Sequence, residues 1–436
     1  MRRNFSEWYL IVEKTVMTQI KDHKKIKPNY GVTRLACYIG YIVQAIVNNF
    51  VPLLFVELSE SYSIPLIKIT FLITINFIIQ LTVDLLSAFF LDRIGYRASV
   101  IGAHGLVAAG FVMLTVLPNV TYDPFWGILI SVVVYAVGGG LLEVVISPII
   151  DATPAENSGR SMSFLHSFYC WGHVGVVLLS TLFFYVFGIG SWRVAALLWA
   201  LVPVLNIPLF AVSPLDMVAA DEANDCQKDK TSAPSSKPMV IPALLRSGTF
   251  WLPVIMMVAA GASEQAVSQW ASSFAERGLG VGKAVGDLAG PMAFAFLMGL
   301  SRLISGKWAD KLDNVRTIKY SSFLCIAAYL TIVITPSPIA GLVGCAICGF
   351  SVGVMWPGTY TTASEKLGGG TAMFALLALA GDVGCALGPT VAGVASGLCG
   401  DNLRVGIAAA LVFPVLMLMG VLLIGGSKTG NSQKSQ

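Results

Sequence analysis

The chain has 436 residues, of which 56% are apolar and only 12% are charged. Soluble domains have about 45–50% apolar and about 25% charged residues, so this composition excludes a soluble globular protein. The net charge of +4 alone would allow an acidic partner such as nucleic acid, but the positions of the basic residues, given below, argue against one. The apolar residues form runs of about 20, the length of a membrane-spanning helix. The sequence therefore predicts a helical membrane protein that crosses the bilayer several times.

The first 31 residues are basic and contain no long apolar run. Their apolar residues recur at helical spacing, which allows an amphipathic helix on the membrane surface. A basic tail without such a helix is the alternative. In either case we expect residues 1–31 to form a cytoplasmic tail.

Twelve apolar segments follow this tail, and a polar stretch at 213–247 divides them into six and six. Their lengths predict an all-α membrane protein of twelve transmembrane helices in two pseudo-symmetric six-helix bundles, at 32–212 and 248–425. The polar stretch is expected to be a cytoplasmic loop, and residues 426–436 a cytoplasmic tail. The apolar segments are 35–56, 67–91, 98–117, 125–150, 161–187, 193–212, 248–272, 285–306, 318–335, 339–363, 370–397 and 405–425.

The basic residues set the expected orientation. Cytoplasmic loops of membrane proteins carry an excess of Lys and Arg. With both termini in the cytoplasm, the outer side holds only five of the 28 Lys and Arg residues. We therefore expect a multi-pass protein of the cell membrane (plasma or inner) with both termini inside. The five outer residues are Lys68, Arg193, Arg277, Lys283 and Arg404.

Two loops at matching places in the halves carry an Asp followed by a basic residue, Asp92-Arg93 after span 2 and Asp310-Lys311 after span 8. Together with the span count, these loops resemble the major facilitator superfamily, whose loop pattern is G-x-x-x-D-[RK]-x-G-[RK]-[RK]. The chain departs from this pattern at Ala88, Tyr96 and Asp313. The resemblance implies that the loops brace neighbouring helices and gate motion between the halves. The implied gating residues are Asp92, Arg93, Arg97, Asp310 and Lys311.

Residues 138–172 resemble the fucose-permease-like branch of that superfamily, which contains sugar:proton symporters. A Gly-rich stretch precedes Glu143, a proline follows, and an F-x-x-x-G segment comes next. On this resemblance Glu143 takes the place of the proton-linked glutamate, and His166 and Tyr169 face the sugar. Span 1 departs from the branch because Asn49 replaces its aspartate, so proton coupling would depend on Glu143 with Asp84 or His166.

The residues themselves also indicate a polar solute site. In span 5, His166, Tyr169, Cys170 and His173 share one helical face, and in span 7 Gln265 and Gln269 do the same. Amide and carboxyl groups bond hydroxyls, and aromatic rings cover apolar faces, which suits a neutral polyhydroxylated solute such as a sugar. The candidate solute-binding residues are Gln44, Asn48, Asn49, Glu143, His166, Tyr169, Glu264, Gln265, Gln269, Trp270 and Trp356, the last beside a proline expected to interrupt span 10.

Ionisable groups at membrane depth are costly and indicate function by default. With Arg302 counted among the cytoplasmic basic residues, no Lys or Arg at membrane depth is available to neutralise Glu143. A buried carboxyl group without a cationic partner favours its protonated form, which is the property that a proton carrier needs. Glu143 is therefore the leading candidate for proton coupling, ahead of Asp84 and His166.

No intact catalytic or metal motif supports an enzyme. Gly349 to Gly353 match G-x-S-x-G, but that motif needs a strand-to-helix turn and here lies in an apolar helix. Cys345 and Cys348 lack a second pair to complete a metal site. We therefore expect no cofactor and no metal, and a monomer whose partners are a small-molecule solute, protons and lipid, without nucleic acid. Proton symport is the preferred mode, and a uniporter for the same solutes or an efflux carrier for amphipathic compounds remains open.

Overall fold

The computed structural model describes residues 30–153, 158–215, 241–308, 313–367 and 371–426. Within these residues, twelve helical segments are long and apolar enough to cross a membrane, which confirms the predicted number of spans. The expected amphipathic helix of the N-terminal tail lies outside the described residues.

The spans of the first half are α2 (Tyr30–Asn49) continued by η1 (Val51–Leu54) and α3 (Phe55–Ser61), α4 (Leu66–Ile94), α5 (Tyr96–Val120), α6 (Pro124–Ala152), α7 (Ser158–Phe187), and η2 (Ile189–Ser191) with α8 (Trp192–Val212). In the second half a short helix α10 (Ile241–Arg246) lies in the predicted central loop, and α11 (Gly248–Ser268) continues into α12 (Ala271–Ser273) and η3 (Phe274–Gly278). Then follow α13 (Lys283–Asp287) with η4 (Leu288–Met292) and α14 (Ala293–Lys307), α15 (Asn314–Ile334), α16 (Pro338–Val352) with α17 (Met355–Leu367), α18 (Thr371–Leu398), and α19 (Leu403–Ala410) with α20 (Val412–Gly426).

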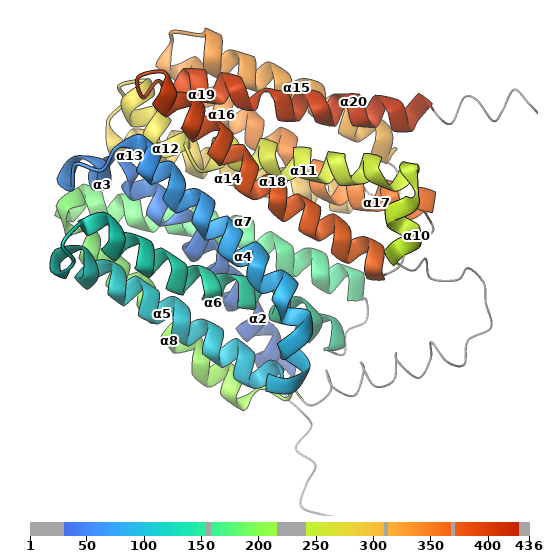
Figure 1. Ribbon diagram of the computed structural model, residues 1–436, viewed down its shortest axis with the longest axis horizontal. Helices are drawn as coiled ribbons and strands as arrows, with labels where there is room; N and C mark the ends of the chain where they lie inside the picture. The colour runs from blue at the N-terminus through green and yellow to red at the C-terminus, as the bar shows by residue number, and fades with distance from the viewer. Residues whose placement is uncertain (1–29, 154–157, 216–240, 309–312, 368–370, 427–436) are drawn as a thin grey trace, which may run out of the picture.

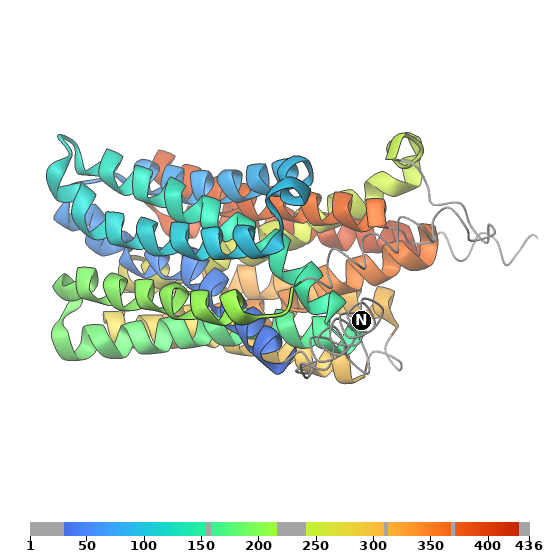
Figure 2. The ribbon, with the colours of Figure 1, turned by 90° about the horizontal axis from the view of Figure 1, so that it is seen from below.

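The spans run along the longest axis of the molecule and form two bundles (Figures 1 and 2). Helices α2 to α8, blue to green, pack on one another, and α11 to α20, yellow to red, form the second group. The two groups meet where α4 packs against α18 and α7 against α14. This arrangement is the predicted fold of two six-helix bundles.

The two ends of the molecule can be told apart by their turns. One end, called here the terminal end, carries Tyr30, the turn at Gly95 and Ile424. The other, called the opposite end, carries the turns at Ser63, Gly188 and Gly400. Gly95 has φ 82° and Gly188 has φ 79°, a left-handed conformation that glycine adopts without strain.

Helix starts at the opposite end follow from local chemistry. The carboxylate of Asp123 accepts a hydrogen bond from the Phe125 N–H at 2.9 Å, and Pro124 occupies the first helical position of α6, where a missing N–H is tolerated. The same N–H bond holds the pKa of the Asp123 carboxyl below its usual range. Span 10 is interrupted between α16 and α17, directly before Trp356 and Pro357, as the proline predicts.

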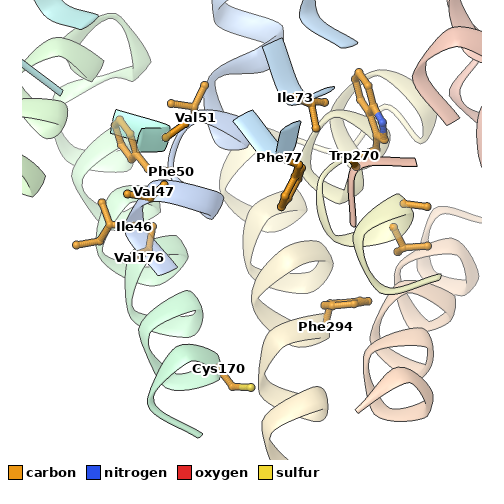
Figure 3. Packing of buried hydrophobic residues seen from close by; sticks show 14 of the residues in the cluster. Ile46, Val47, Phe50, Val51, Ile73, Phe77, Cys170, Val176, Trp270 and Phe294 are labelled. Carbon is orange, nitrogen blue, oxygen red and sulfur yellow. The ribbon is translucent and has the colours of Figure 1, made fainter. Parts of the chain in front are cut away.

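A continuous apolar cluster fills both bundles and the seam between them. Figure 3 shows its central part: residues of the first span, such as Val47 and Phe50, lie near Phe77 of α4, with Trp270 and Phe294 contributed by the second half. The side chains at the seam are therefore apolar apart from a limited set of polar groups, and these polar groups form the candidate site.

Candidate functional site

Glu143 lies on α6, nine residues before the helix ends at Ala152, which places it about 14 Å inside the bundle. Its carboxylate accepts a hydrogen bond from Gln44 Nε2 of α2 at 3.1 Å. Gln44 is buried but Glu143 is exposed, so the carboxylate borders a space that water can enter. Within the described residues Glu143 has no ion-pair partner, and the structure thus places a carboxyl group at membrane depth without a cation beside it.

Side-chain amides continue from Gln44 across the first bundle. Gln44 Nε2 also donates to Gln80 Oε1 at 2.9 Å, and Gln80 Nε2 donates to Asn48 Oδ1 at 2.9 Å. Asn76 Nδ2 donates to the same Asn48 oxygen at 3.3 Å. All four amide side chains are buried. Their mutual bonds satisfy several groups that water does not reach, although Gln44 Oε1 and Asn76 Oδ1 have no partner.

The chain of hydrogen bonds then crosses to the second bundle. Gln269, directly after α11, donates from Nε2 to the backbone oxygen of Asn48 at 3.1 Å and to Gln265 Oε1 at 3.1 Å. Gln265 Nε2 donates to Glu264 Oε1 at 3.3 Å. The structure therefore brings Gln44, Asn48, Glu264, Gln265 and Gln269 together, and it links them from Glu143 in one bundle to Glu264 in the other.

Glu264 forms an ion pair that the sequence did not predict. Arg302 Nη2 lies 3.1 Å from Glu264 Oε2, and Arg302 Nη1 lies 3.4 Å from Cys170 Sγ of α7. The expectation that no basic residue is available at membrane depth is wrong, because Arg302, counted above with the cytoplasmic basic residues, lies within α14 five residues before its end. The cation is bound to Glu264, so it does not neutralise Glu143.

A second carboxyl cluster lies beside Glu143. Asp84 of α4 and Asp382 of α18 lie close enough across the seam to interact with each other. Both interact electrostatically with Glu143.

Span 5 supplies its predicted residues to the same region. The ring of His166 packs edge-on against Tyr41 at 5.3 Å, and Tyr41 bonds Ser147 of α6 at 2.9 Å. Asn49 Nδ2 donates to the Tyr169 hydroxyl at 3.3 Å. His166 is exposed, as Glu143 is, and His173 is buried.

The two candidate tryptophans occupy different positions. Trp270 is fully buried, and its indole N–H donates to the backbone oxygen of Pro389 at 3.0 Å while its ring contacts Phe55. Trp356 is half-buried and presses against Gly381, where a side chain would overlap its ring. Trp270 thus joins the bundles, whereas Trp356 lies beside the carboxyl cluster.

The predicted gating residues are only partly described. Arg97 donates to the backbone oxygens of Phe210 at 3.2 Å and Ser213 at 2.8 Å, so it caps the end of α8. Arg93 is exposed, and the backbone of Asp92 is helical. Asp310 and Lys311 lie outside the described residues.

Sequence reasoning missed Asn76, Gln80 and Arg302. A signal for the first two was present, because Asn76, Gln80 and Asp84 recur at intervals of four residues and share one face of α4. Arg302 lies inside the predicted span 285–306 but near its cytoplasmic end, so it is counted above with the basic residues of that side. In the described part of the chain, no group of His, Cys, Asp and Glu side chains could hold a metal ion.

Comparison with known proteins identifies similar sequences and folds. A family model described as the Major Facilitator Superfamily matches residues 37–389. No curated protein matches the sequence. A crystal structure of a D-xylose-proton symporter is similar with a TM-score of 0.74 at 13% identity, covering 90% of this chain and 96% of that one.

Two structures of the transporter FucP are also similar. One, in the outward conformation, has a TM-score of 0.54 at 14% identity, covering 90% of this chain and 98% of that one. The other is a variant of the Escherichia coli fucose:proton symporter with a TM-score of 0.55 at 14% identity, covering 91% of this chain and 99% of that one. These likenesses concern the fold.

Proposed function

The chain belongs to the Major Facilitator Superfamily, and we propose that it is a proton-coupled symporter for a sugar or a similar small neutral polar solute. It is a multi-pass membrane protein and a transporter, not an enzyme. The proposal adds the class of solute and the coupling ion. It also assigns residues 32–212 and 248–425 to two units that rock against each other around one site.

The observation that carries the proposal is the hydrogen-bonded chain of amides between the bundles. It begins at the exposed carboxylate of Glu143 and ends at Glu264, and its middle members come from α2, α4 and α11. Amides donate and accept hydrogen bonds without net charge, which is the chemistry that binds hydroxyl groups. The names of the similar structures, symporters of D-xylose and fucose, support the same class of solute.

Contacts between the bundles support alternating access. Toward the opposite end, Thr74 bonds Thr390 at 2.6 Å and Thr181 donates to Asp287 at 3.3 Å, and Arg277 pairs with Glu60 at 3.3 Å. Glu143, nearer the terminal end, is exposed. With both termini in the cytoplasm of a cell or inner membrane, as proposed, this state opens inward and releases solute and proton there.

The test is uptake by the full chain, reconstituted as the monomer we expect, in proteoliposomes with and without an inward proton gradient. Labelled D-xylose, L-fucose and D-glucose are the probes. The wild-type protein should accumulate at least one sugar only when the gradient is present. Gradient-independent equilibration would favour a uniporter, in keeping with Asn49, and transport of lipophilic cations in place of sugars would favour an efflux carrier.

Glu143→Gln keeps the size of the side chain but cannot carry a proton. We expect this variant to lose gradient-driven accumulation, by about tenfold or more, while it still exchanges labelled for unlabelled sugar. Glu57→Gln, a change of a carboxyl group on α3 outside the chain of amides, is the control and should accumulate sugar normally. Intact accumulation by Glu143→Gln would show that the proton is carried elsewhere.

A further inference from the structure

A small cavity lies beside the chain of amides, between the two bundles. Its lining includes the polar residues Asn48, Asn76 and Gln269, and the aromatic residues Phe55 and Tyr135 form part of its wall. The other residues that line it are aliphatic: Val47, Val51, Pro52, Leu72 and Ile73. The cavity has room for about one water-sized group, which is also the size of a single hydroxyl group of a solute.

Asn76 brings an unsatisfied acceptor to this cavity. Asn76 is only 6% exposed. Its Nδ2 donates to Asn48 Oδ1 at 3.3 Å, whereas its Oδ1 is buried without a hydrogen-bond partner. A buried carbonyl oxygen without a donor costs about 1–3 kcal/mol. The site therefore lacks one hydrogen-bond donor, which a bound solute can supply.

The orientation of this amide follows step by step from Glu143. The carboxylate can only accept, so Gln44 must direct its NH₂ group toward it. That NH₂ group also bonds Gln80, which must accept through Oε1 and donate through Nε2 to Asn48. Since Asn48 Oδ1 is then an acceptor, Asn76 must present its NH₂ group to it, and the oxygen of Asn76, a residue that lines the cavity, is left as an acceptor without a donor.

We propose that Asn76 determines specificity by accepting a hydrogen bond from a hydroxyl group of the solute, and that Glu143 holds it in this orientation through Gln44, Gln80 and Asn48. The inference rests on the proposed function. It adds a specificity-determining residue and the direction of the hydrogen bond between that residue and the solute. The site selects a hydroxyl donor at this point of the solute and rejects a group that only accepts.

The same chain makes the orientation of Asn76 depend on the charge of Glu143. When Glu143 takes up a proton, its carboxyl group can donate to Gln44 Oε1 as well as accept from Gln44 Nε2, so the chain of amides no longer has one fixed direction. Asn76 can then present either its oxygen or its NH₂ group to a solute hydroxyl, so the protonated protein should discriminate less between hydroxyl and fluorine. The ionisable groups around Glu143 that bear on this step are Tyr41 of α2, Asp84 of α4, Tyr360 of α17, and Asp382 and Cys385 of α18.

The experiment measures, at neutral pH, how tightly the purified full chain binds three forms of each sugar. The forms are the parent sugar and, for each carbon in turn, its monodeoxy and its monofluoro derivative. D-xylose, L-fucose and D-glucose are the parent probes, and affinity is measured by calorimetric titration. Fluorine accepts weakly and cannot donate. At the position that contacts Asn76, the fluoro and deoxy sugars should therefore bind equally poorly, each about tenfold more weakly than the parent.

In Asn76→Leu the three forms of the sugar should bind with similar affinity at that position, because no acceptor is left to distinguish them. Asn76→Thr changes the polarity of the side chain less than Asn76→Leu does. Its hydroxyl can accept a hydrogen bond from the parent sugar and can donate one to fluorine. It should bind the parent sugar and discriminate less against fluorine, and it provides the test if the leucine variant does not fold. In Glu143→Gln, whose amide can donate to Gln44 as the protonated acid would, discrimination against fluorine should also fall.

The matched control is Asn206→Leu. Asn206 of α8 is likewise buried with an unpartnered Oδ1, but it bonds His104 and Ala36 inside the first bundle and does not line the cavity. Its substitution should leave the discrimination pattern unchanged. If Asn76→Leu retains the wild-type pattern at every carbon, the inference is overturned while the proposed function stands, and if no sugar binds the wild-type protein, both are wrong.

Discussion

Arg302 and Glu264 form a largely buried ion pair at the end of the chain of amides. Arg302 is 21% exposed in its side chain, and Glu264 is 10% exposed, so both charges are largely removed from water. Leaving one partner of such a pair uncompensated is far more destabilising than replacing both. The pair therefore holds α11 and α14 together only as long as it is complete.

We expect Arg302→Met to destabilise the protein by roughly 3 kcal/mol, the low end of the range for a broken buried pair, because part of Arg302 is exposed. The double variant Arg302→Met/Glu264→Gln should recover much of that loss. Thermal unfolding in detergent of the wild-type protein, the two single variants and the double variant measures the coupling energy of the pair. Arg316→Met breaks an exposed pair with Asp313 and should change the melting temperature little; additive losses in the cycle would contradict a coupled pair.

The sequence could predict Glu143, Gln265 and Gln269, because a polar side chain in an apolar run is conspicuous. It could not predict their partners. The bond from Gln269 to Asn48 joins residues 221 positions apart, and no local pattern encodes such a distance. Arg302 was missed for a different reason: it lies near the end of its span, where a long basic side chain is expected to reach the membrane surface, and nothing in the sequence shows that it pairs with Glu264 instead.

At the scale of elements, α11 and α18 pack so closely that backbone meets backbone. A side chain added at Gly388 would overlap the carbonyl oxygen of Ala262, and one at Gly384 would overlap that of Val258. Small residues at such contacts are typical of helix pairs in membranes. The glycine spacing in span 11 predicts a close neighbour, but it does not say that this neighbour is α11.

Gly388→Ala should force α11 and α18 apart, lower stability by about 1–3 kcal/mol and reduce transport. The measurements are thermal unfolding and initial uptake rate. Gly102→Ala on α5 is the control, since nothing lies within 4 Å of the added carbon, and it should be neutral or slightly stabilising. Equal behaviour of the two variants would mean that the contact tolerates a methyl group.

At the scale of the whole molecule, the number of spans and their division into two bundles follow from hydropathy, because each span must bury its own backbone polar groups in lipid. Which end of the seam is closed does not follow. The same residues must allow both arrangements, with a difference of only a few kcal/mol between them. The contacts of Thr74 with Thr390 and of Thr181 with Asp287 therefore belong to one state of a cycle.

A covalent link across the seam should stop that cycle. In Thr74→Cys/Thr390→Cys we expect a crosslink under mild oxidation and a loss of transport of tenfold or more, restored by a reducing agent. Each single variant, treated in the same way, controls for the native cysteines and should remain active. Transport by the fully crosslinked protein would show that this contact does not separate during the cycle.

The hydroxyls at this seam have a further property. Thr74 lies 3.0 Å from the carbonyl oxygen of Thr70, and Thr390 lies 2.6 Å from that of Ala386, each within its own helix. When the bundles part, each hydroxyl can turn back to its own helix, so neither is stranded in hydrocarbon without a partner. The hydrogen bond between the two hydroxyls can therefore break and re-form at every turnover without leaving a polar group unsatisfied.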